Sequence, residues 1–119
     1  MPKKSLAYSV LDVILEKGIT SGLEHFKELK KSDIYAINEN EMNSVGYQLL
    51  QTGKTKEAIE VFKLNTEAFP QSGNTYDSLG EAYLKNGDKK LAIENYEKSI
   101  ALDPANENGK KVLEEISRS

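Results

Sequence analysis

The fold is decided by two stretches that repeat each other, GYQLLQTGKTKEAIEVFKLNTEAFP (residues 46–70) and GEAYLKNGDKKLAIENYEKSIALDP (residues 80–104). Two glycines, an Ala-Ile-Glu triplet and a closing proline recur at an offset of 34 residues, and Phe62 recurs as Tyr96. A fixed period of this length indicates a repeat architecture, in which one supersecondary unit is copied and stacked along an axis. The repeated unit lacks the features of an active site, so the sequence favours binding over catalysis.

Each copy is predicted to be an antiparallel pair of helices. In the second copy, apolar residues recur at three- and four-residue steps over residues 74–86, which is the period of one helical face. Gly87 ends this helix, and Asp88 is placed as the N-cap of a second helix over about residues 89–102. Pro104 closes the pair, because the residue before a proline is pushed out of helical geometry.

The first copy follows the same plan, with helices over about residues 41–52 and 56–69 and Thr55 as the N-cap of the second helix. Ala58 and its counterpart Ala92 are both predicted to be buried. The residues predicted to face inward in the last helix of the second copy are Leu91, Ala92, Ile93, Tyr96 and Ile100.

Gly80 lies inside the first helix of its pair, where glycine costs up to about 1 kcal/mol relative to alanine. Gly46 holds the equivalent place in the first copy. We therefore expect a neighbouring helix to approach so closely at this position that no side chain fits.

A third, degenerate copy precedes the two clear ones. GLEHF at residues 22–26 reads like residues 58–62, but at a spacing of 36 rather than 34, so the loop over about residues 32–39 is expected to carry the extra length. A helix is predicted before it, over about residues 5–17, ending at Gly18. The apolar residues expected on one side of that helix are Leu6, Val10, Leu11, Ile14 and Leu15.

A last helix is predicted over about residues 107–117 and is expected to cap the stack. The sequence therefore predicts a single all-α domain, a right-handed stack of antiparallel helix pairs with seven helices and no strands. Its parts are the degenerate pair with its loop (residues 1–38), two repeats (39–72 and 73–106) and the capping helix (107–119).

The two clear copies resemble the tetratricopeptide repeat. The matching residues are Met42, Val45, Gly46, Leu49, Ala58, Phe62 and Pro70 in the first copy, and Tyr76, Leu79, Gly80, Tyr83, Ala92, Tyr96 and Pro104 in the second. Met42 stands where a large aromatic residue is usual, and Asn65 and Ser99 stand where a third small residue is common. The resemblance implies a helical stack and a function in protein interaction.

A narrower resemblance is carried by residues 45–50, 61–65 and 76–83. These segments are similar to the repeat region at the C-terminal end of certain bacterial serine hydrolases and esterases. The resemblance implies an alternative function, an auxiliary domain that packs on the catalytic domain or mediates self-association. No part of the hydrolase catalytic motif is present in the sequence.

Composition narrows the partner classes. Sixteen basic and nineteen acidic residues leave a net charge of −3, which disfavours a nucleic-acid partner because phosphate binding requires a basic surface. The absence of cysteine excludes disulfides and thiolate sites. No apolar run approaches the roughly 20 residues of a membrane-spanning helix, so membrane insertion is not expected. A complete chain is expected in the cytoplasm, and a region of a larger hydrolase in the periplasm or outside the cell.

No set of residues predicts catalysis, a cofactor or a metal site. His25 is the only histidine, and a lone histidine on a helix is usually a solvated or half-packed side chain. Ser44 and Ser78 have no plausible base to activate them. Asp77 and Glu81 lie one turn apart, but such a pair is more often a solvated helix face than an acid–base pair. The chain is therefore predicted not to be an enzyme.

The candidate binding surface is the concave face of the stack, which the first helix of each pair lines. The residues predicted to be exposed there are Asn40, Asn43, Tyr47, Leu50 and Gln51 from the first copy, Asn74, Asp77, Glu81, Leu84 and Lys85 from the second, and Lys111 from the capping helix. Asp77 and Glu81 are expected beside Asn43 and Tyr47 and favour a basic group, so the expected partner is a protein or peptide with basic residues. Two alternatives stay open, namely ordinary solvated positions without a ligand and self-association.

Overall fold

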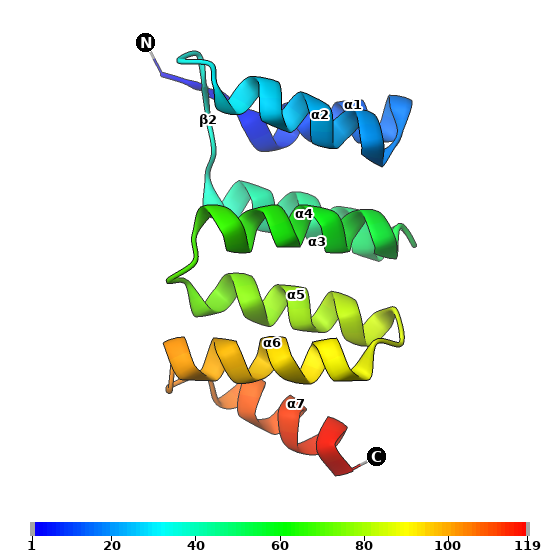
Figure 1. Ribbon diagram of the computed structural model, residues 1–119, viewed down its shortest axis with the longest axis vertical. Helices are drawn as coiled ribbons and strands as arrows, with labels where there is room; N and C mark the ends of the chain where they lie inside the picture. The colour runs from blue at the N-terminus through cyan, green and yellow to red at the C-terminus, as the bar shows by residue number, and fades with distance from the viewer. Residues whose placement is uncertain (1, 119) are drawn as a thin grey trace.

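Seven helices follow one another through residues 2–118, the residues that the computed structural model describes. They are α1 (Leu6–Lys17), α2 (Ile19–Lys30), α3 (Glu39–Gln51), α4 (Thr55–Ala68), α5 (Gly73–Lys85), α6 (Lys89–Leu102) and α7 (Glu107–Arg118). Figure 1 shows α1 and α2 at one end of the long axis, α3 and α4 at the next level, and then α5, α6 and α7, with the termini at opposite ends. The particle measures 47 × 27 × 17 Å. The predicted all-α stack of helix pairs is confirmed, and the helix ends lie within about two residues of those predicted.

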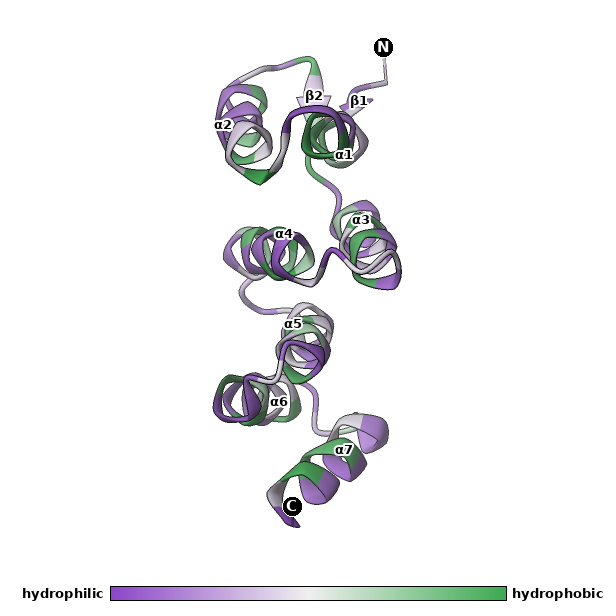
Figure 2. Ribbon diagram, turned by 90° about the vertical axis from the view of Figure 1, so that its right-hand side faces the viewer, coloured by the Kyte–Doolittle hydropathy of each residue, from purple (hydrophilic) through white to green (hydrophobic). Residues whose placement is uncertain are grey.

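Consecutive helices pack as pairs, α1 with α2, α3 with α4, and α5 with α6. In addition, α5 packs against α4 and α7 packs against α6, which joins the two clear repeats and the capping helix. The first pair is joined differently, since α3 packs mainly against α1 rather than α2. Figure 2 shows α1 over α3 and α2 over α4, whereas α5 sits between the two columns. The degenerate pair therefore does not reproduce the packing of the other two.

Glycines with positive φ form the turns inside the two clear pairs. Gly53 (φ 83°) and Gly87 (φ 84°) adopt the left-handed conformation, which residues with a Cβ rarely adopt. The predicted N-cap at Thr55 is wrong, because Thr55 is already the first residue of α4. Asp88 occupies the N-cap position of α6 as predicted, although its carboxylate accepts a hydrogen bond from Asn86 Nδ2 (2.8 Å) rather than from the helix.

A glycine in the first helix of each clear repeat lies against an aromatic ring of the second helix. A Cβ at Gly80 would stand 3.0 Å from the ring of Tyr96, and a Cβ at Gly46 would stand 2.3 Å from the ring of Phe62. Real Cβ atoms essentially never approach closer than 3.0 Å. The close approach expected at Gly80 is confirmed, and the one at Gly46 is tighter.

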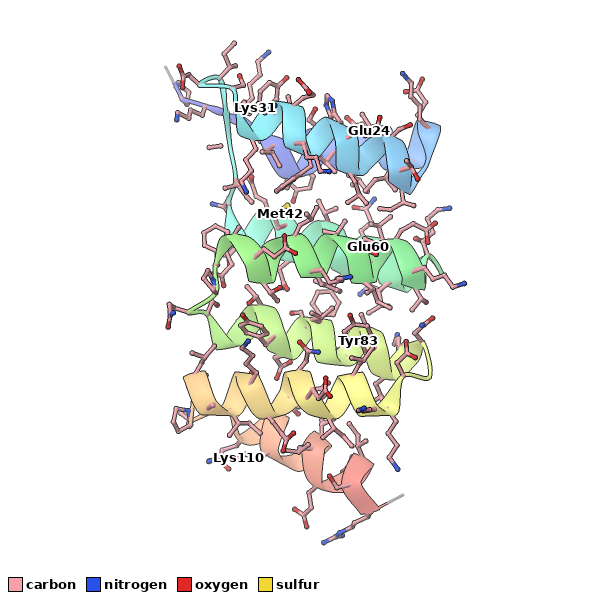
Figure 3. All side chains as sticks on the ribbon, viewed as in Figure 1. Glu24, Lys31, Met42, Glu60, Tyr83 and Lys110 are labelled. Atoms are coloured by element: carbon pink, nitrogen blue, oxygen red, sulfur yellow. The ribbon has the colours of Figure 1, made fainter. Side chains whose placement is uncertain are left out.

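The main apolar core runs from α1 to α5, and a smaller cluster joins α6 to α7. Side chains fill the layers between the helices, among them Met42, which is buried below the first pair (Figure 3). Ala58 and Ala92 are completely buried, as predicted. The prediction that Leu91 faces inward is wrong, since it is 38% exposed. Leu15, expected on the apolar side of its helix, is 52% exposed. Each stands next to a buried residue, Ile14 or Ala92, which takes the inward position at that turn.

Two short strands, β1 (Lys4–Ser5) and β2 (Tyr35–Ala36), pair in parallel, so the prediction of no strands is wrong at this point. The loop between α2 and α3 is extended here and runs beside the segment that precedes α1. Lys4 N donates a hydrogen bond to Ile34 O (2.8 Å). The pairing satisfies backbone groups of two extended segments that have no helix to bond with.

Asn65 and Ser99, which depart from the repeat pattern, are fully buried. Asn65 Nδ2 donates a hydrogen bond to the Glu39 carbonyl (3.1 Å), which ties α4 to the start of α3. Ser99 Oγ accepts a hydrogen bond from Asn106 Nδ2 (3.1 Å), which ties α6 to the start of α7. Ser99 is thus satisfied by a hydrogen bond to a neighbouring element. Asn65 is satisfied at Nδ2 only, since its Oδ1 is buried without a hydrogen-bond partner among the described residues.

The two glycine contacts predict different tolerance to a methyl group. Gly46→Ala should destabilise the protein by about 1–3 kcal/mol, because the new Cβ overlaps the fully buried ring of Phe62. Gly80→Ala should change stability by less than about 1 kcal/mol, because a shift of Tyr96 by a few tenths of an ångström relieves the contact and alanine favours the helix. Urea unfolding followed by circular dichroism measures both. Equal effects would show that the ring contact does not set the helix spacing.

Candidate functional site

The residues predicted to bind a partner lie mainly on α3 and α5, which contact each other along one side of the stack. The α3–α5 face consists of Asn40, Asn43, Tyr47 and Gln51 of α3 and Asn74, Asp77, Glu81 and Lys85 of α5. Asn43, Tyr47, Asp77 and Glu81 are half-buried, and the other four residues are exposed. The middle of the face is therefore built from side chains that also contact neighbouring helices, and its two ends are open to solvent.

Tyr47 lies at the centre of the α3–α5 face. Its hydroxyl donates a hydrogen bond to Glu81 Oε1 (3.0 Å), which joins α3 to α5. Its ring packs edge-on against Phe62, with the centroids 5.2 Å apart. Burial raises the pKa of Tyr47 to about 12, a hydrogen bond with Ser78 opposes the rise, and the charges of Glu81 and Asp77 add to it. The expected neighbourhood of Tyr47 and Glu81 is confirmed.

Two further hydrogen bonds hold the face together, and sequence reasoning missed both donors. Ser78 Oγ donates to Asn43 Oδ1 (2.6 Å), and Asn106 Nδ2 donates to Asp77 Oδ2 (2.7 Å). Asn106 Oδ1 in turn accepts from the backbone N–H of Gly109 (2.9 Å) and so caps α7. An asparagine directly before a helix is an N-cap signal that identifies Asn106, whereas no signal marks Ser78 as a contact between helices.

The structure corrects some of the predicted site residues. Leu50 is not on the exposed face, because it is 4% exposed and belongs to the same apolar cluster as the core residues of α1. Asp77 and Glu81 are not simply solvated, because Glu81 accepts a hydrogen bond from Tyr47 of α3 and Asp77 accepts one from Asn106, directly before α7. Alanine at either position therefore costs stability as well as charge. Leu84 and Lys111 are exposed, as predicted.

The tyrosines near the two carboxylates are neutral at physiological pH. Burial raises the pKa of Tyr96 above its ordinary range, and the charges of Asp77 and Glu81 add to this rise. Tyr47 and Tyr96 therefore offer hydroxyl groups, and the negative charge in this part of the molecule belongs to the two carboxylates.

The single histidine and the carboxylates of residues 2–118 form no further site. His25 is half-buried, and its Nε2 lies 3.0 Å from Ser9 Oγ. It is thus a half-packed side chain on a helix. Within this described part of the chain, no three His, Cys, Asp or Glu side chains gather into a metal-binding group. None of the helices described is long and apolar enough to cross a membrane.

The raised pKa of Tyr47 predicts that the protein loses stability at high pH. Its pKa rises from 10.0 to about 12 on folding, so the folded protein holds the proton more tightly and stability falls as the pH rises through this range. Tyr47→Phe removes this titration. The difference in unfolding free energy between the wild-type protein and the variant should therefore shrink as the pH rises from 10.0 to about 12. Urea unfolding at stepped pH measures the difference, and a constant difference would contradict the prediction.

The comparisons in sequence match parts of the chain to known proteins. The tetratricopeptide repeat family model matches residues 73–106, the second clear repeat. Cellulose synthase operon protein C of Escherichia coli (strain K12) is 33% identical over 66 residues, and small glutamine-rich tetratricopeptide repeat-containing protein 2 of Mycosarcoma maydis is 36% identical over 63 residues. The matches cover 56% and 53% of this chain but only 6% and 18% of the relatives, so the chain spans a small part of their length.

Solved structures share the fold at low sequence identity. PcrH from Pseudomonas aeruginosa has a TM-score of 0.64 at 17% identity, over 94% of this chain and 89% of PcrH. The first tetratricopeptide repeat region of Spaghetti (RPAP3), bound to the HSP90 peptide SRMEEVD, has a TM-score of 0.66 at 17% identity, over 95% of this chain and 88% of that one. MamA has a TM-score of 0.62 at 21% identity, over 88% of this chain and 60% of MamA. The family match thus covers residues 73–106, and the solved structures share the helical stack of the whole chain.

Proposed function

We propose that this chain is a non-catalytic protein-interaction module, which binds an extended peptide or a segment of a neighbouring domain on the α3–α5 face. The observation that carries the proposal is the position of Tyr47 beside Glu81 and Asp77. An aromatic ring with a polar tip thus lies next to two carboxylates in the middle of one face. Asn40 and Asn74, both exposed, provide amide groups at one end of the same face.

The charge of the face favours a peptide that carries lysine or arginine. Asp77 and Glu81 each accept one hydrogen bond from the protein, and a carboxylate accepts several, so both retain capacity for a cation. Partial burial strengthens such a pair relative to a fully exposed one. The peptide SRMEEVD bound to the Spaghetti (RPAP3) domain carries three acidic residues and one arginine, whereas the peptide proposed for this chain is basic.

The double variant Asp77→Asn with Glu81→Gln tests this proposal. The amides keep oxygen acceptors for Asn106 and Tyr47 but remove both negative charges. We expect the affinity for a lysine-containing peptide to fall about tenfold, with the unfolding free energy nearly unchanged. Fluorescence anisotropy measures the change with four labelled peptides that differ only in a central lysine, arginine, glutamine or glutamate.

A matched control removes the same charge elsewhere. Glu94→Gln with Glu97→Gln neutralises two exposed carboxylates on α6 and changes the net charge by the same amount. This control should keep the full affinity and the preference for lysine and arginine. Equal losses in the two double variants, or equal affinity of the wild-type protein for all four peptides, would contradict the proposal.

The alternative proposal is an auxiliary C-terminal domain of a larger bacterial serine hydrolase or esterase. It rests on the resemblance of residues 45–50, 61–65 and 76–83 to such regions. The curated relatives also hold their matching segment within much longer chains. The surrounding coding sequence separates the two proposals, because a hydrolase domain in the same reading frame supports the alternative and its absence rules the alternative out.

A further inference from the structure

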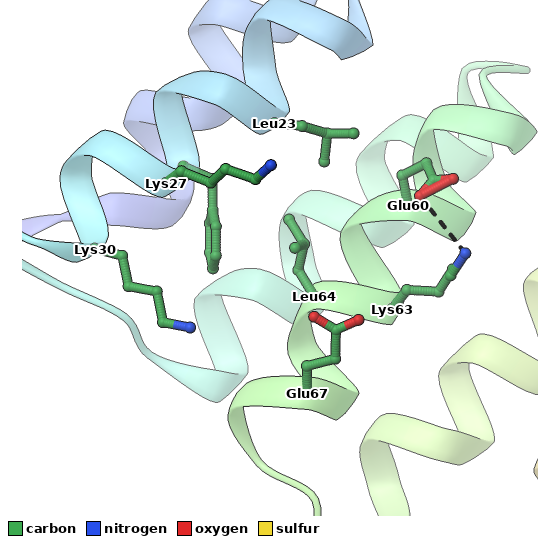
Figure 4. A pocket seen from close by; sticks show the side chains of 8 residues that line it. Leu23, Lys27, Lys30, Glu60, Lys63, Leu64 and Glu67 are labelled. Carbon is green, nitrogen blue, oxygen red and sulfur yellow. Dashed lines mark ion pairs between the residues drawn. The ribbon is translucent and has the colours of Figure 1, made fainter.

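A groove lies between α2 and α4 and shares no residue with the α3–α5 face (Figure 4). It has a volume of about 300 Å³, and its apolar lining comes from Leu23, Phe26 and Leu64. The charged side chains around it are Lys27, Lys30, Glu60, Lys63 and Glu67. We call this feature the α2–α4 groove.

The α2–α4 groove belongs to the irregular junction between the degenerate pair and the first clear repeat. At the regular junction, α5 packs against both α3 and α4, whereas at the irregular one α3 packs mainly against α1. Figure 2 shows α2 and α4 on the same side of the stack, with no helix of residues 2–118 between them. Because α3 packs on α1, the sides of α2 and α4 that face each other are left to form a groove.

The surroundings of the groove are more basic than the protein as a whole. Glu60 forms an ion pair with Lys63 (3.9 Å), whereas Lys27 and Lys30 form none within the described part of the chain. Lys30 also borders a neighbouring hollow, which adds two more lysines and one aspartate. The two hollows together bring five lysines against three carboxylates, in a chain whose net charge is −3.

We propose that the α2–α4 groove is a second protein-docking site, which takes a peptide segment with a bulky apolar side chain flanked by aspartate or glutamate. The apolar side chain packs against the half-buried Leu23 and Leu64, above the ring of Phe26, which is 4% exposed and forms the floor. The carboxylates lie along Lys27 and Lys30. Lys30 Nζ stands 5.8 Å from the centroid of the Phe26 ring, so the cationic and apolar parts of the site adjoin. The volume is at the small end for ligand sites, which suits one or two anchoring side chains.

Selection from a phage-displayed library of random peptides tests the site. The bait is the Asp77→Asn, Glu81→Gln protein, so that the result does not depend on the α3–α5 face. Enriched peptides should combine aspartate or glutamate with leucine, isoleucine or phenylalanine. Enrichment of basic or uncharged peptides, or no enrichment, would overturn the proposal and leave the proposed function untouched.

An enriched peptide is then synthesised and titrated against variants. Lys27→Gln with Lys30→Gln should weaken binding about three- to tenfold and flatten its salt dependence. Lys54→Gln with Lys90→Gln removes the same charge from exposed lysines outside the groove and should leave the affinity unchanged. Leu64→Lys removes apolar surface and adds a positive charge, so docking in the groove predicts lost binding. Tighter binding to Leu64→Lys would show mere attraction of acidic peptides to lysines and would overturn the proposal.

Two further measurements keep the test decisive. Leu64 also packs against the apolar core, so circular dichroism must show that Leu64→Lys is folded. Leu23→Lys makes the same change from the α2 side and replaces that variant if it is unfolded. Sedimentation of the protein alone shows whether a second copy occupies the groove. A dimer that is lost in the Lys27→Gln, Lys30→Gln variant would overturn the assignment to an acidic partner.

Discussion

The contact between a glycine of one helix and an aromatic ring of the next sets the geometry of both clear repeats. Because only hydrogen fits at Gly46, the ring of Phe62 lies directly against the backbone of α3. The same ring supports Tyr47 edge-on at 5.2 Å, and Tyr47 carries the hydrogen bond that joins α3 to α5. The residue at the centre of the candidate binding face is therefore positioned by the contact that determines the spacing of the helix pair.

Hydrogen bonds order the side chains of the α3–α5 face. Asn43, Tyr47 and Asp77 each take part in a hydrogen bond to the next first helix or to the α7 cap. A ligand that binds there meets side chains that are already ordered, so little rotamer entropy is lost on binding. The same arrangement means that a truncation to alanine changes stability and binding together, and only replacements that preserve the acceptor oxygen separate the two effects.

The sequence predicts the regular part of this fold well, because glycine, proline and apolar period act locally and recur at 34 residues. It also predicts Tyr47 beside Glu81, since equivalent first helices are neighbours. It fails where burial depends on which helix lies opposite. Leu50 and Leu84 hold equivalent positions, yet they are 4% and 38% exposed, because Leu50 lies in the core cluster that includes α1 and Leu84 lies outside both clusters. Two-residue strands such as β1 and β2 carry no periodic pattern at all.

Regular repeats and their irregular junction contribute different surfaces. Two similar repeats stacked in the regular way place equivalent helices side by side, and the acidic α3–α5 face follows from that regularity. The α2–α4 groove follows from the loss of that regularity. The degenerate pair stands 36 residues from the first clear repeat instead of 34, and it packs on that repeat through the contact of α1 with α3. The lysines of α2 then face an opening rather than a neighbouring helix. The acidic face suits the basic segment proposed for it, and the basic groove suits the acidic one. The break in the repeat is the physical origin of the groove.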